Sequence, residues 1–244
     1  MLVTKIPFNA PASRARLEGL LSRLGLTSAS RVLDVGCGRG EALSMLVESA
    51  GCRGFGVDPK PDEIALARER SRALDDRIEW HARKIEEVDV GGGFDAAICI
   101  GATHAFGPPG AALEKTLEAL RAYVKPGGRL LIGEGYWKQD PAESYLRGTG
   151  FSRSDLRTHD ENGQAGERRG FRLVHQETSS LEEWDRFENA FLETAEACFQ
   201  GDPDNTDARR DREHWRAWNA RYYEEGRSTL GFGFYVFECQ GPAA

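Results

Sequence analysis

Glycines at alternate positions, Gly36, Gly38 and Gly40, follow a short apolar run at residues 31–35. Glycine has no side chain and tolerates positive φ, so such a loop lets backbone N–H groups approach a ligand closely. Asp58 follows the next apolar run, about 20 residues further on, where a carboxylate can accept hydrogen bonds from two ribose hydroxyls. This spacing indicates a site for a cofactor that contains a nucleoside.

An ordinary tight turn, or the phosphate loop of a nicotinamide-dependent enzyme, would also place glycines in this way. The position of Asp58 disfavours an ordinary turn, which needs no acid at that distance. In the dinucleotide pattern G-x-G-x-x-G/A, counted from Gly36, the sixth position falls on Glu41, whose side chain would obstruct close helix packing. The sequence matches G-x-G-x-G instead, which favours a different nucleoside cofactor.

Two side chains near the carboxyl ends of later predicted strands could take part in proton transfer. His104 lies shortly after the apolar run 94–100 and could accept a proton near neutral pH. Glu134 follows the run 129–133 and could orient an acceptor or neutralise a cationic one. For both, a structural hydrogen bond in a loop is an equally good interpretation. The other histidines lack metal-ligand spacing, so we expect no metal site. They are His81, His159, His175 and His214.

Strands and helices alternate through the first part of the chain. Short apolar runs predict strands, and helical spacing of apolar residues predicts helices between them. The predicted strands cover residues 31–35, 54–57, 78–81, 94–100 and 129–133. The predicted helices cover residues 12–25, 41–49, 61–74 and 111–124. This alternation is typical of a doubly wound α/β fold.

The last third departs from this alternation. A short helix is predicted at residues 152–157, and strands at residues 171–176 and 230–239. Between those two strands, residues 181–199 and 207–226 read as helices. If the first of these strands is parallel to the core strands, its carboxyl end opens on the cofactor side of the sheet. The two helices would then form a cap, well placed to act as a lid.

Four stretches of the chain resemble, in order, the motifs of class I S-adenosylmethionine-dependent methyltransferases of the small-molecule type. They are Val32-Leu33-Asp34-Val35-Gly36-Cys37-Gly38-Arg39-Gly40, Gly56-Val57-Asp58, residues 94–101 and residues 124–132, so the resemblance covers roughly residues 30–135. It implies a Rossmann-like seven-stranded sheet whose last strand is antiparallel. It also implies S-adenosylmethionine as cofactor and S-adenosylhomocysteine as product.

The same resemblance implies cofactor contacts at the ends of several strands. Asp34 would help to hold the amino-acid part, Asp58 the ribose, and the backbone of Ile100 and Gly101 the methionine moiety. Many relatives carry an acid near the adenine amino group, where this chain reads Ala82-Arg83-Lys84-Ile85. Adenine would therefore be held by the backbone of the last two of these residues and by apolar packing. The full expected set is Asp34, Gly36, Cys37, Gly38, Gly40, Asp58, Pro59, Lys84, Ile85, Ile100 and Gly101.

Aromatic side chains are frequent in the predicted cap and after the fifth predicted strand. Each cap helix carries an aromatic stripe at helical spacing. Such side chains could line a pocket for a small organic acceptor, apolar or cationic. Alternatively, the stripes pack on each other and on the core. The candidate substrate-binding residues are His104, Tyr136, Trp137, Trp184, Trp215 and Trp218.

Length and composition fit a water-soluble protein with one methyltransferase domain. The 244 residues would divide into an N-terminal helical segment (1–29), an α/β core (30–178 and 229–240) and the cap (179–228). The net charge of −7 disfavours nucleic acid as a partner. The cysteines show no disulfide or zinc spacing, residues 1–11 show no export signal, and no apolar run reaches membrane-span length. We therefore expect a cytoplasmic protein.

These patterns predict an enzyme that methylates nitrogen, oxygen or carbon of a small organic acceptor. Methyl transfer is an in-line displacement, so positioning supplies much of the acceleration. A general base is needed only when the acceptor is protonated in solution. Methylation of RNA or protein by the same core, and cofactor binding without catalysis, are the alternatives.

Overall fold

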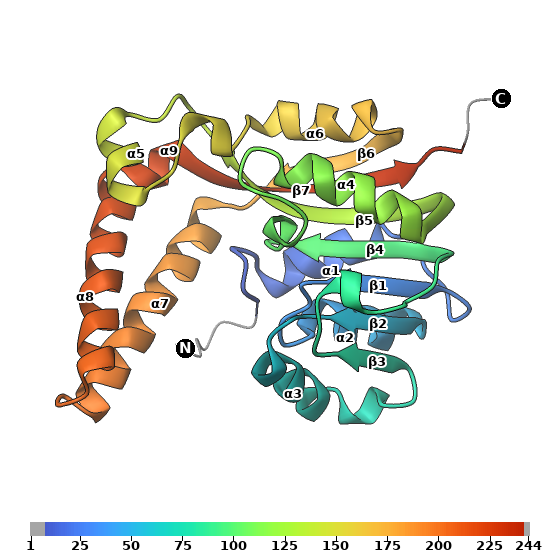
Figure 1. The fold of residues 1–244 in the computed structure, drawn as a ribbon, viewed down its shortest axis with the longest axis horizontal. Coiled ribbons are helices and arrows are strands. Elements are labelled where there is room, and N and C mark those ends of the chain that lie inside the picture. The colour runs from blue at the N-terminus through green and yellow to red at the C-terminus, as the bar shows by residue number, and fades with distance from the viewer. Residues whose placement is uncertain (1–7, 242–244) are drawn as a thin grey trace.

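The computed structural model describes residues 8–241, which form a seven-stranded sheet covered by helices on both faces (Figure 1). The strand order is β3-β2-β1-β4-β5-β7-β6, and β7 is antiparallel to both of its neighbours. This arrangement confirms the predicted Rossmann-like fold. The strands are β1 (Arg31–Val35), β2 (Arg53–Val57), β3 (Ile78–His81), β4 (Phe94–Ile100), β5 (Val124–Trp137), β6 (Phe171–Thr178) and β7 (Leu230–Cys239).

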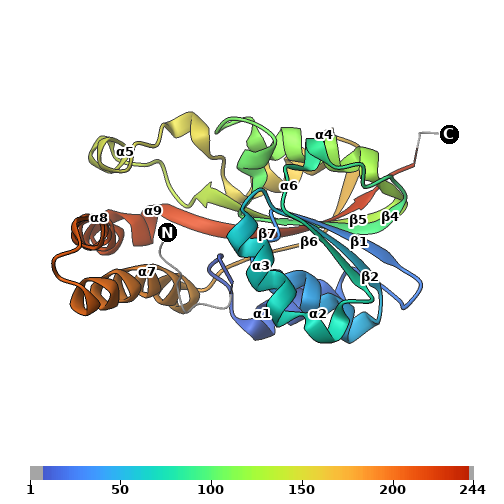
Figure 2. The same cartoon turned by 60° about the horizontal axis from the view of Figure 1, so that its bottom comes forward.

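Neighbouring residues of the central strands face two separate hydrophobic clusters, because side chains alternate between the faces of a sheet. In β1, Val32 belongs to one cluster and Leu33 to the other. Figure 2 shows the two helical layers that cover these faces. One layer contains α1 (Arg14–Ser22), α2 (Glu41–Ala50) and α3 (Pro61–Arg70), and the other contains α4 (Ala112–Tyr123) and α6 (His159–Arg168).

The carboxyl ends of the parallel strands meet at one edge of the sheet. β2 and β3 lie on one side of β1, and β4 and β5 lie on the other side. The chain order therefore reverses between β1 and β4, and a crevice forms beyond the strand ends at such a point. The predicted glycine loop directly follows β1 and opens into this crevice.

Helices inserted between β6 and β7 project beyond the sheet (Figures 1 and 2). They are α7 (Leu181–Gly201), α8 (Thr206–Arg221), the π-helix Tyr222–Gly226 and α9 (Arg227–Thr229), and we call them the cap. Ser180 and Glu183 form a capping box that starts α7. β6 and β5 are both antiparallel to β7, so β6 runs parallel to β5. Its carboxyl end opens at the cofactor edge, as the sequence-based argument required.

β5 is much longer than the predicted strand 129–133. Its pairing with β7 continues as far as Trp137, which lies opposite Leu230. Glu134, Tyr136 and Trp137 therefore lie within β5 rather than after it, which corrects their predicted location. The antiparallel ladder supplies backbone hydrogen bonds to these residues, and local sequence could not reveal its length.

Two helices have no counterpart in the sequence-based prediction, α5 (Glu143–Thr149) and α6. The buried residues of α6 are Asn162 and small side chains, so the usual apolar periodicity is missing. The predicted helix 152–157 contains only the 3-10 turn Arg153–Asp155. Other 3-10 turns are Arg72–Leu74, Ile85–Glu87 and Thr103–Ala105.

The predicted N-terminal segment 1–29 is described from Phe8 onward, and residues 1–7 and 242–244 lie outside the described residues. Within residues 8–241, no helix combines the length and apolarity needed to cross a bilayer.

Candidate active site

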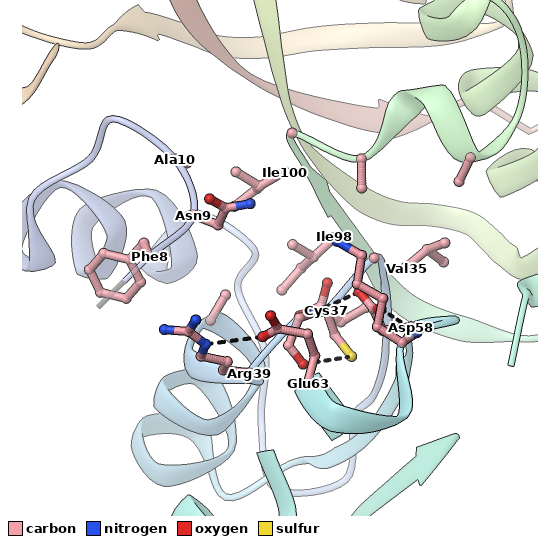
Figure 3. A pocket seen from close by; sticks show the side chains of 18 of the residues that line it. Phe8, Asn9, Ala10, Val35, Cys37, Arg39, Asp58, Glu63, Ile98 and Ile100 are labelled. Carbon is pink, nitrogen blue, oxygen red and sulfur yellow. Dashed lines mark hydrogen bonds and ion pairs between the residues drawn. The ribbon is translucent and has the colours of Figure 1, made fainter. Parts of the chain in front are cut away.

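A cavity of about 820 Å³ opens at the carboxyl edge of the sheet (Figure 3). Its walls come from the glycine loop with the strand ends around it, from the N-terminal segment that begins at Phe8, and from the cap. The volume lies within the range of roughly 300–1,000 Å³ that is usual for small-molecule sites. The cavity is therefore large enough to hold a cofactor together with a second small molecule.

Steric contacts require glycine at two positions of the loop. Gly36 has a φ of +72°, and a Cβ there would stand 2.2 Å from the Cβ of Ala102. Gly40 has a φ of +75°, and a Cβ there would stand 2.2 Å from the ring of Trp80. Gly38 also has a positive φ, but the space beside its Cα is open and it lines the cavity. The loop is thus pressed against the protein at two points and exposes its backbone between them.

Trp80 supports the glycine loop, a role that the sequence alone did not reveal. Its indole N–H donates a hydrogen bond of 3.1 Å to the buried hydroxyl of Ser71. A Cβ on Gly56 would stand 2.3 Å from the same ring, so Trp80 occupies the space left by two glycines. The available signal was Gly40 together with Gly56, because a large side chain must fill the space that these two glycines leave.

The Asp58 carboxylate lies across the mouth of the glycine loop. One oxygen accepts a hydrogen bond of 3.1 Å from the backbone N–H of Gly38, and the other accepts one of 2.9 Å from that of Lys60. The side chain is buried and lines the cavity, as does Pro59 beside it. These bonds fix the orientation of a carboxylate whose remaining lone pairs can accept hydrogen bonds from a ligand.

Asp34 lines the cavity from within β1 and is almost completely buried. Burial, together with the nearby charges of Asp58 and Glu41, raises the pKa of Asp34 to about 8. Burial and the same acids raise the pKa of the Cys37 thiol, which therefore stays neutral. Because the ionised form of Asp34 is costly here, a cationic group beside it would be stabilising.

The turns after β3 and β4 supply the other predicted cofactor residues. Lys84 and Ile85 line the cavity at the start of a 3-10 turn, and the Ile85 side chain is buried. Ile100 and Gly101 line it at the end of β4. The Gly101 N–H donates a hydrogen bond of 2.9 Å to the Gly133 carbonyl, so sheet pairing uses this donor. One residue of the predicted cofactor set, Gly40, does not line the cavity within the described residues. It contacts Trp80 on the protein side of the loop.

His104 lies in the 3-10 turn that follows β4, exposed at the wall of the cavity. The preceding residue anchors this turn, since the buried Thr103 hydroxyl donates a hydrogen bond to Glu134. The Thr103 carbonyl also accepts a hydrogen bond of 3.3 Å from the hydroxyl of Thr116. Hydrogen bonds of Thr103 thus fix the backbone next to His104, and the His104 side chain lies at the wall of the cavity.

Glu134 does not reach the cavity among the residues that the structure describes. Its other carboxylate oxygen accepts a hydrogen bond of 2.8 Å from the backbone N–H of Gly135. Burial raises the pKa of Glu134, an effect that its hydrogen bonds partly offset. Glu134 thus lies behind the turn of His104, to which it is linked by the hydrogen bond from Thr103.

The cap contributes side chains from both of its long helices to the cavity. Phe191 comes from α7, and Asp211, His214 and Trp215 come from α8. Phe191 and Trp215 stack with ring centroids 4.5 Å apart and an interplanar angle of 16°. Alternating charges at residues 207–213 are typical of a solvated helix face, so the sequence alone does not single out Asp211.

The other aromatic candidates pack elsewhere and are absent from the lining that residues 8–241 provide. Trp184 is buried against Tyr222 and Phe232 at the base of the cap. The Trp218 indole donates a hydrogen bond of 2.8 Å to Glu188. Tyr136 lies against His159, and Trp137 lies against Tyr145 and Phe151. Tyr136 and Trp137 lie in the part of β5 that pairs with β7, and their side chains pack between the sheet and the helices.

The N-terminal segment forms one wall of the cavity, which was not predicted from the sequence. Phe8, Asn9 and Ala10 line the cavity, and the Asn9 carbonyl would lie 3.6 Å from a Cβ on Gly101 (Figure 3). This segment therefore passes close to the end of β4. Residues that far from the glycine loop in sequence carry no local signal of such a role.

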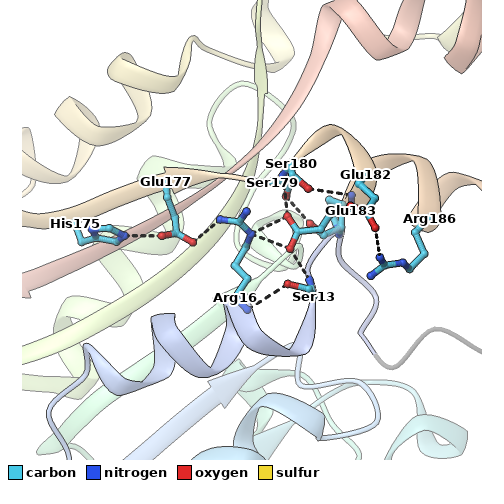
Figure 4. A network of polar contacts seen from close by, with 10 residues as sticks. Ser13, Arg16, His175, Glu177, Ser179, Ser180, Glu182, Glu183 and Arg186 are labelled. Atoms are coloured by element: carbon cyan, nitrogen blue, oxygen red, sulfur yellow. Dashed lines mark hydrogen bonds and ion pairs between the residues drawn. The ribbon is translucent and has the colours of Figure 1, made fainter.

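An ion-pair network fastens the N-terminal segment to the base of the cap (Figure 4). The Arg16 guanidinium lies 2.7 Å from the Glu183 carboxylate and 2.6 Å from that of Glu177. The buried Glu183 side chain also accepts a hydrogen bond of 2.8 Å from the backbone N–H of Ser13. The start of α1, the end of β6 and the start of α7 are thus held together.

A doubly wound sheet with a glycine loop and an oriented acid at its switch point defines a nucleoside-cofactor protein of the α/β class. Comparison with known proteins narrows this class. The family model described as a methyltransferase domain matches residues 32–128. The chain is 31% identical to the uncharacterized protein YjhP of Escherichia coli K12 over 87% of this chain and 86% of that protein.

A crystal structure of a SAM-dependent methyltransferase from Geobacter sulfurreducens, in complex with S-adenosyl-L-homocysteine, shows the same fold. Its TM-score is 0.86 at 29% identity, and the match covers 97% of this chain and 95% of that one. A ubiquinone biosynthesis O-methyltransferase from Xanthomonas euvesicatoria is 31% identical over 48% of this chain and 47% of its own length. The chain belongs to the class I S-adenosylmethionine-dependent methyltransferases.

Proposed function

We propose that this chain works as one cytoplasmic methyltransferase domain whose methyl acceptor is a small organic molecule, enclosed between the core and the cap. One observation carries the proposal: a single cavity of about 820 Å³ runs from the glycine loop to the stacked pair Phe191 and Trp215. An enclosed aromatic wall suits a molecule of limited size. The net charge of −7, and the Asp211 carboxylate that the cap contributes to the cavity wall, argue against a polyanionic acceptor such as RNA.

The cofactor residues of this chain fit S-adenosylmethionine on geometric grounds. Gly38 offers open backbone to the ligand, and Asp58 presents an oriented carboxylate to the ribose hydroxyls. Asp34, beside this carboxylate, would pair with the ammonium group of the cofactor's amino-acid part. Lys84 and Ile85 would hold the adenine by their backbone, and Ile100 and Gly101 would contact the methionine part.

Bound S-adenosylmethionine supplies an electrophilic methyl group in this site. The chain itself holds the acceptor in line with that group, which converts a bimolecular reaction into an effectively unimolecular one. The N-terminal segment and the cap exclude water by closing two sides of the cavity. When the acceptor is a hydroxyl or a protonated amine, a ring nitrogen of His104 takes the proton. Glu134 keeps this histidine in place through Thr103.

The half-chain similarity to an O-methyltransferase of ubiquinone biosynthesis supports including hydroxylated rings among the acceptors to be tested. It does not define the acceptor, because the match covers 48% of this chain.

A screen of metabolite extracts tests the proposal. The purified protein is incubated with S-adenosylmethionine and fractionated extract, and release of S-adenosylhomocysteine is followed by mass identification of the methylated product. We expect release with a small-molecule fraction and little release with the Asp58→Ala variant. Release with tRNA or protein fractions only would reject the small-molecule acceptor, and cofactor binding without any release would reject catalysis.

A further inference from the structure

The face that α8 turns to the cavity differs from the rest of that helix. Asp211, His214 and Trp215 occupy positions i, i+3 and i+4, which share one side of a helix, and all three line the cavity. The rest of α8 is rich in arginine, but its arginines are absent from the lining that the described residues provide. They are Arg209, Arg210, Arg212, Arg216 and Arg221.

Four of these arginines contact residues that are absent from the cavity lining within the described chain. Arg210 pairs with Asp207, and Arg216 pairs with Glu196 of α7. Arg212 lies 3.6 Å above the centroid of the Phe199 ring. Arg221 lies against α5, where its guanidinium would collide with any side chain at position 148. The positive charge of α8 is thus kept out of the cavity lining, whose Lys and Arg side chains come from the core.

Asp211 gives the cap wall of the cavity its character. Of the cap residues that line the cavity within the described chain, it is the one acid, and no Lys or Arg accompanies it. No ion pair to Asp211 forms among residues 8–241, whereas Glu63 on the opposite wall is paired with Arg39 at 3.0 Å. Among residues 8–241, no Lys or Arg therefore neutralises the carboxylate of Asp211.

The stacked rings beside Asp211 offer a flat surface. The ring planes of Phe191 and Trp215 are nearly parallel and the rings lie face to face, so each covers one face of the other and leaves its outer face and edges for a ligand. The two residues come from separate helices, and packing of α7 on α8 holds the pair in place. An aromatic face attracts both a flat ring and a cation. An acid next to such a face strengthens the preference for positive charge.

Building on the proposed function, we propose that the cap binds the part of the acceptor that is remote from the reacting atom, and that this part is a flat ring with a basic nitrogen. Phe191 and Trp215 contact the ring, and Asp211 pairs with the protonated nitrogen. The same site disfavours a ring that carries a carboxylate, because Asp211 would face a like charge.

Three phenols that differ in the charge of the remote group test this proposal. Tyramine is cationic, 4-hydroxybenzyl alcohol is neutral, and 4-hydroxybenzoate is anionic. Each is titrated by calorimetry into protein saturated with S-adenosylhomocysteine. We expect tyramine to bind about tenfold more tightly than the neutral phenol, and 4-hydroxybenzoate to bind most weakly.

Two variants separate the charge from the ring surface. Asp211→Asn should bring the three affinities within about twofold of one another, while Asp207→Asn, an exposed acid of the same helix, should leave the ranking unchanged. Trp215→Leu should weaken all three ligands by about tenfold and preserve the affinity for S-adenosylhomocysteine.

Tighter binding of 4-hydroxybenzoate than of tyramine, an unchanged ranking in Asp211→Asn, or binding of S-adenosylhomocysteine without any of the phenols would each overturn the proposal. These results differ from failure of the proposed function, which would show in the extract screen as release of S-adenosylhomocysteine with tRNA or protein fractions only, or as no release at all.

Discussion

The two ends of the cavity are built on different physical principles. At the cofactor end, positive φ angles and close contacts of Gly36 and Gly40 with buried neighbours fix the path of the backbone. At the cap end, α8, which lies wholly within the described chain, buries none of its residues. Its side chains can change with little effect on the core. Under the proposed function, the core would therefore select the cofactor and the cap would select the acceptor.

The N-terminal segment connects these two ends. It lines the cavity near the end of β4 and is tied to the start of α7 through Arg16 and Glu183. A displacement of the cap would therefore strain a wall of the cavity beside the glycine loop. The cap is thus only partly covered along α8 but fastened at its base.

The largest effect is expected where the loop meets Trp80. Gly40→Ala should lower the free energy of unfolding by about 3 kcal/mol, because the alanine combines an unfavourable φ with overlap of the Trp80 ring. Urea unfolding measures this change. The matched control is Gly127→Ala, since Gly127 has a φ of +79° but open space beside it. The control should cost about 1 kcal/mol, and equal losses in both variants would show that Trp80 does not constrain the loop.

The next effect concerns the acid at the loop. Asp58→Ala should weaken binding of S-adenosylhomocysteine about thirtyfold, because it removes a charged acceptor of ribose hydrogen bonds and leaves the Gly38 and Lys60 N–H groups without it. Calorimetry measures the affinity. The exposed Asp76→Ala serves as the control. Undiminished binding in Asp58→Ala would contradict the ribose assignment and remove the main support for a rigid cofactor end.

The sequence predicted the strand ends and turns that bring the predicted cofactor residues to the cavity, because the determinants of these elements are local. Gly36, Gly38 and Asp58 stand at fixed spacing beside strands that alternate with helices, and each such pattern reflects one turn or one strand end. Trp80 escaped notice because its role depends on contact with glycines from two other segments. Burial of Asp34 among acids likewise arises only when the strands assemble.

The cap end shows where sequence reasoning stops. Helical spacing located α7 and α8 closely, but which aromatic residue faces the cavity depends on how the helical pair docks. Trp215 reaches the cavity, whereas Trp218 bonds to Glu188 and Trp184 is buried at the base. Tyr136 was misplaced because the length of β5 follows from pairing with a distant strand.

A smaller effect is expected for the proton acceptor between the two ends. His104→Gln should lower turnover of the acceptor identified by the extract screen about tenfold while leaving cofactor affinity within about twofold. This loss is below the usual range for general bases, because the exposed position of His104 allows water to replace it. Steady-state kinetics and calorimetry give the two quantities. Equal losses in turnover and cofactor affinity would assign His104 to cofactor binding instead.

The smallest effect is a proton balance at the cofactor end. With its pKa near 8, Asp34 is mostly protonated at pH 7, and a cationic amino-acid group bound beside it favours the ionised form. Binding of S-adenosylmethionine at pH 7 should therefore release a fraction of one proton. Calorimetry in two buffers of different ionisation enthalpy measures this release, which Asp34→Asn should abolish. An unchanged release in the variant would assign the proton to another group.

The same carboxyl should leave a mark on stability in the absence of cofactor. The folded state holds the Asp34 proton up to about pH 8, while the unfolded chain loses it near pH 4. Folded protein binds more protons across this window, so the free energy of unfolding should fall as pH rises and level off above about pH 8. Asp34→Asn should lack this part of the decline. If the free energy of unfolding has the same pH dependence in the unmodified protein and in Asp34→Asn, Asp34 is ionised in the folded protein. Electrostatic repulsion among the acids would then constrain the cofactor end in addition to the steric contacts of the glycines.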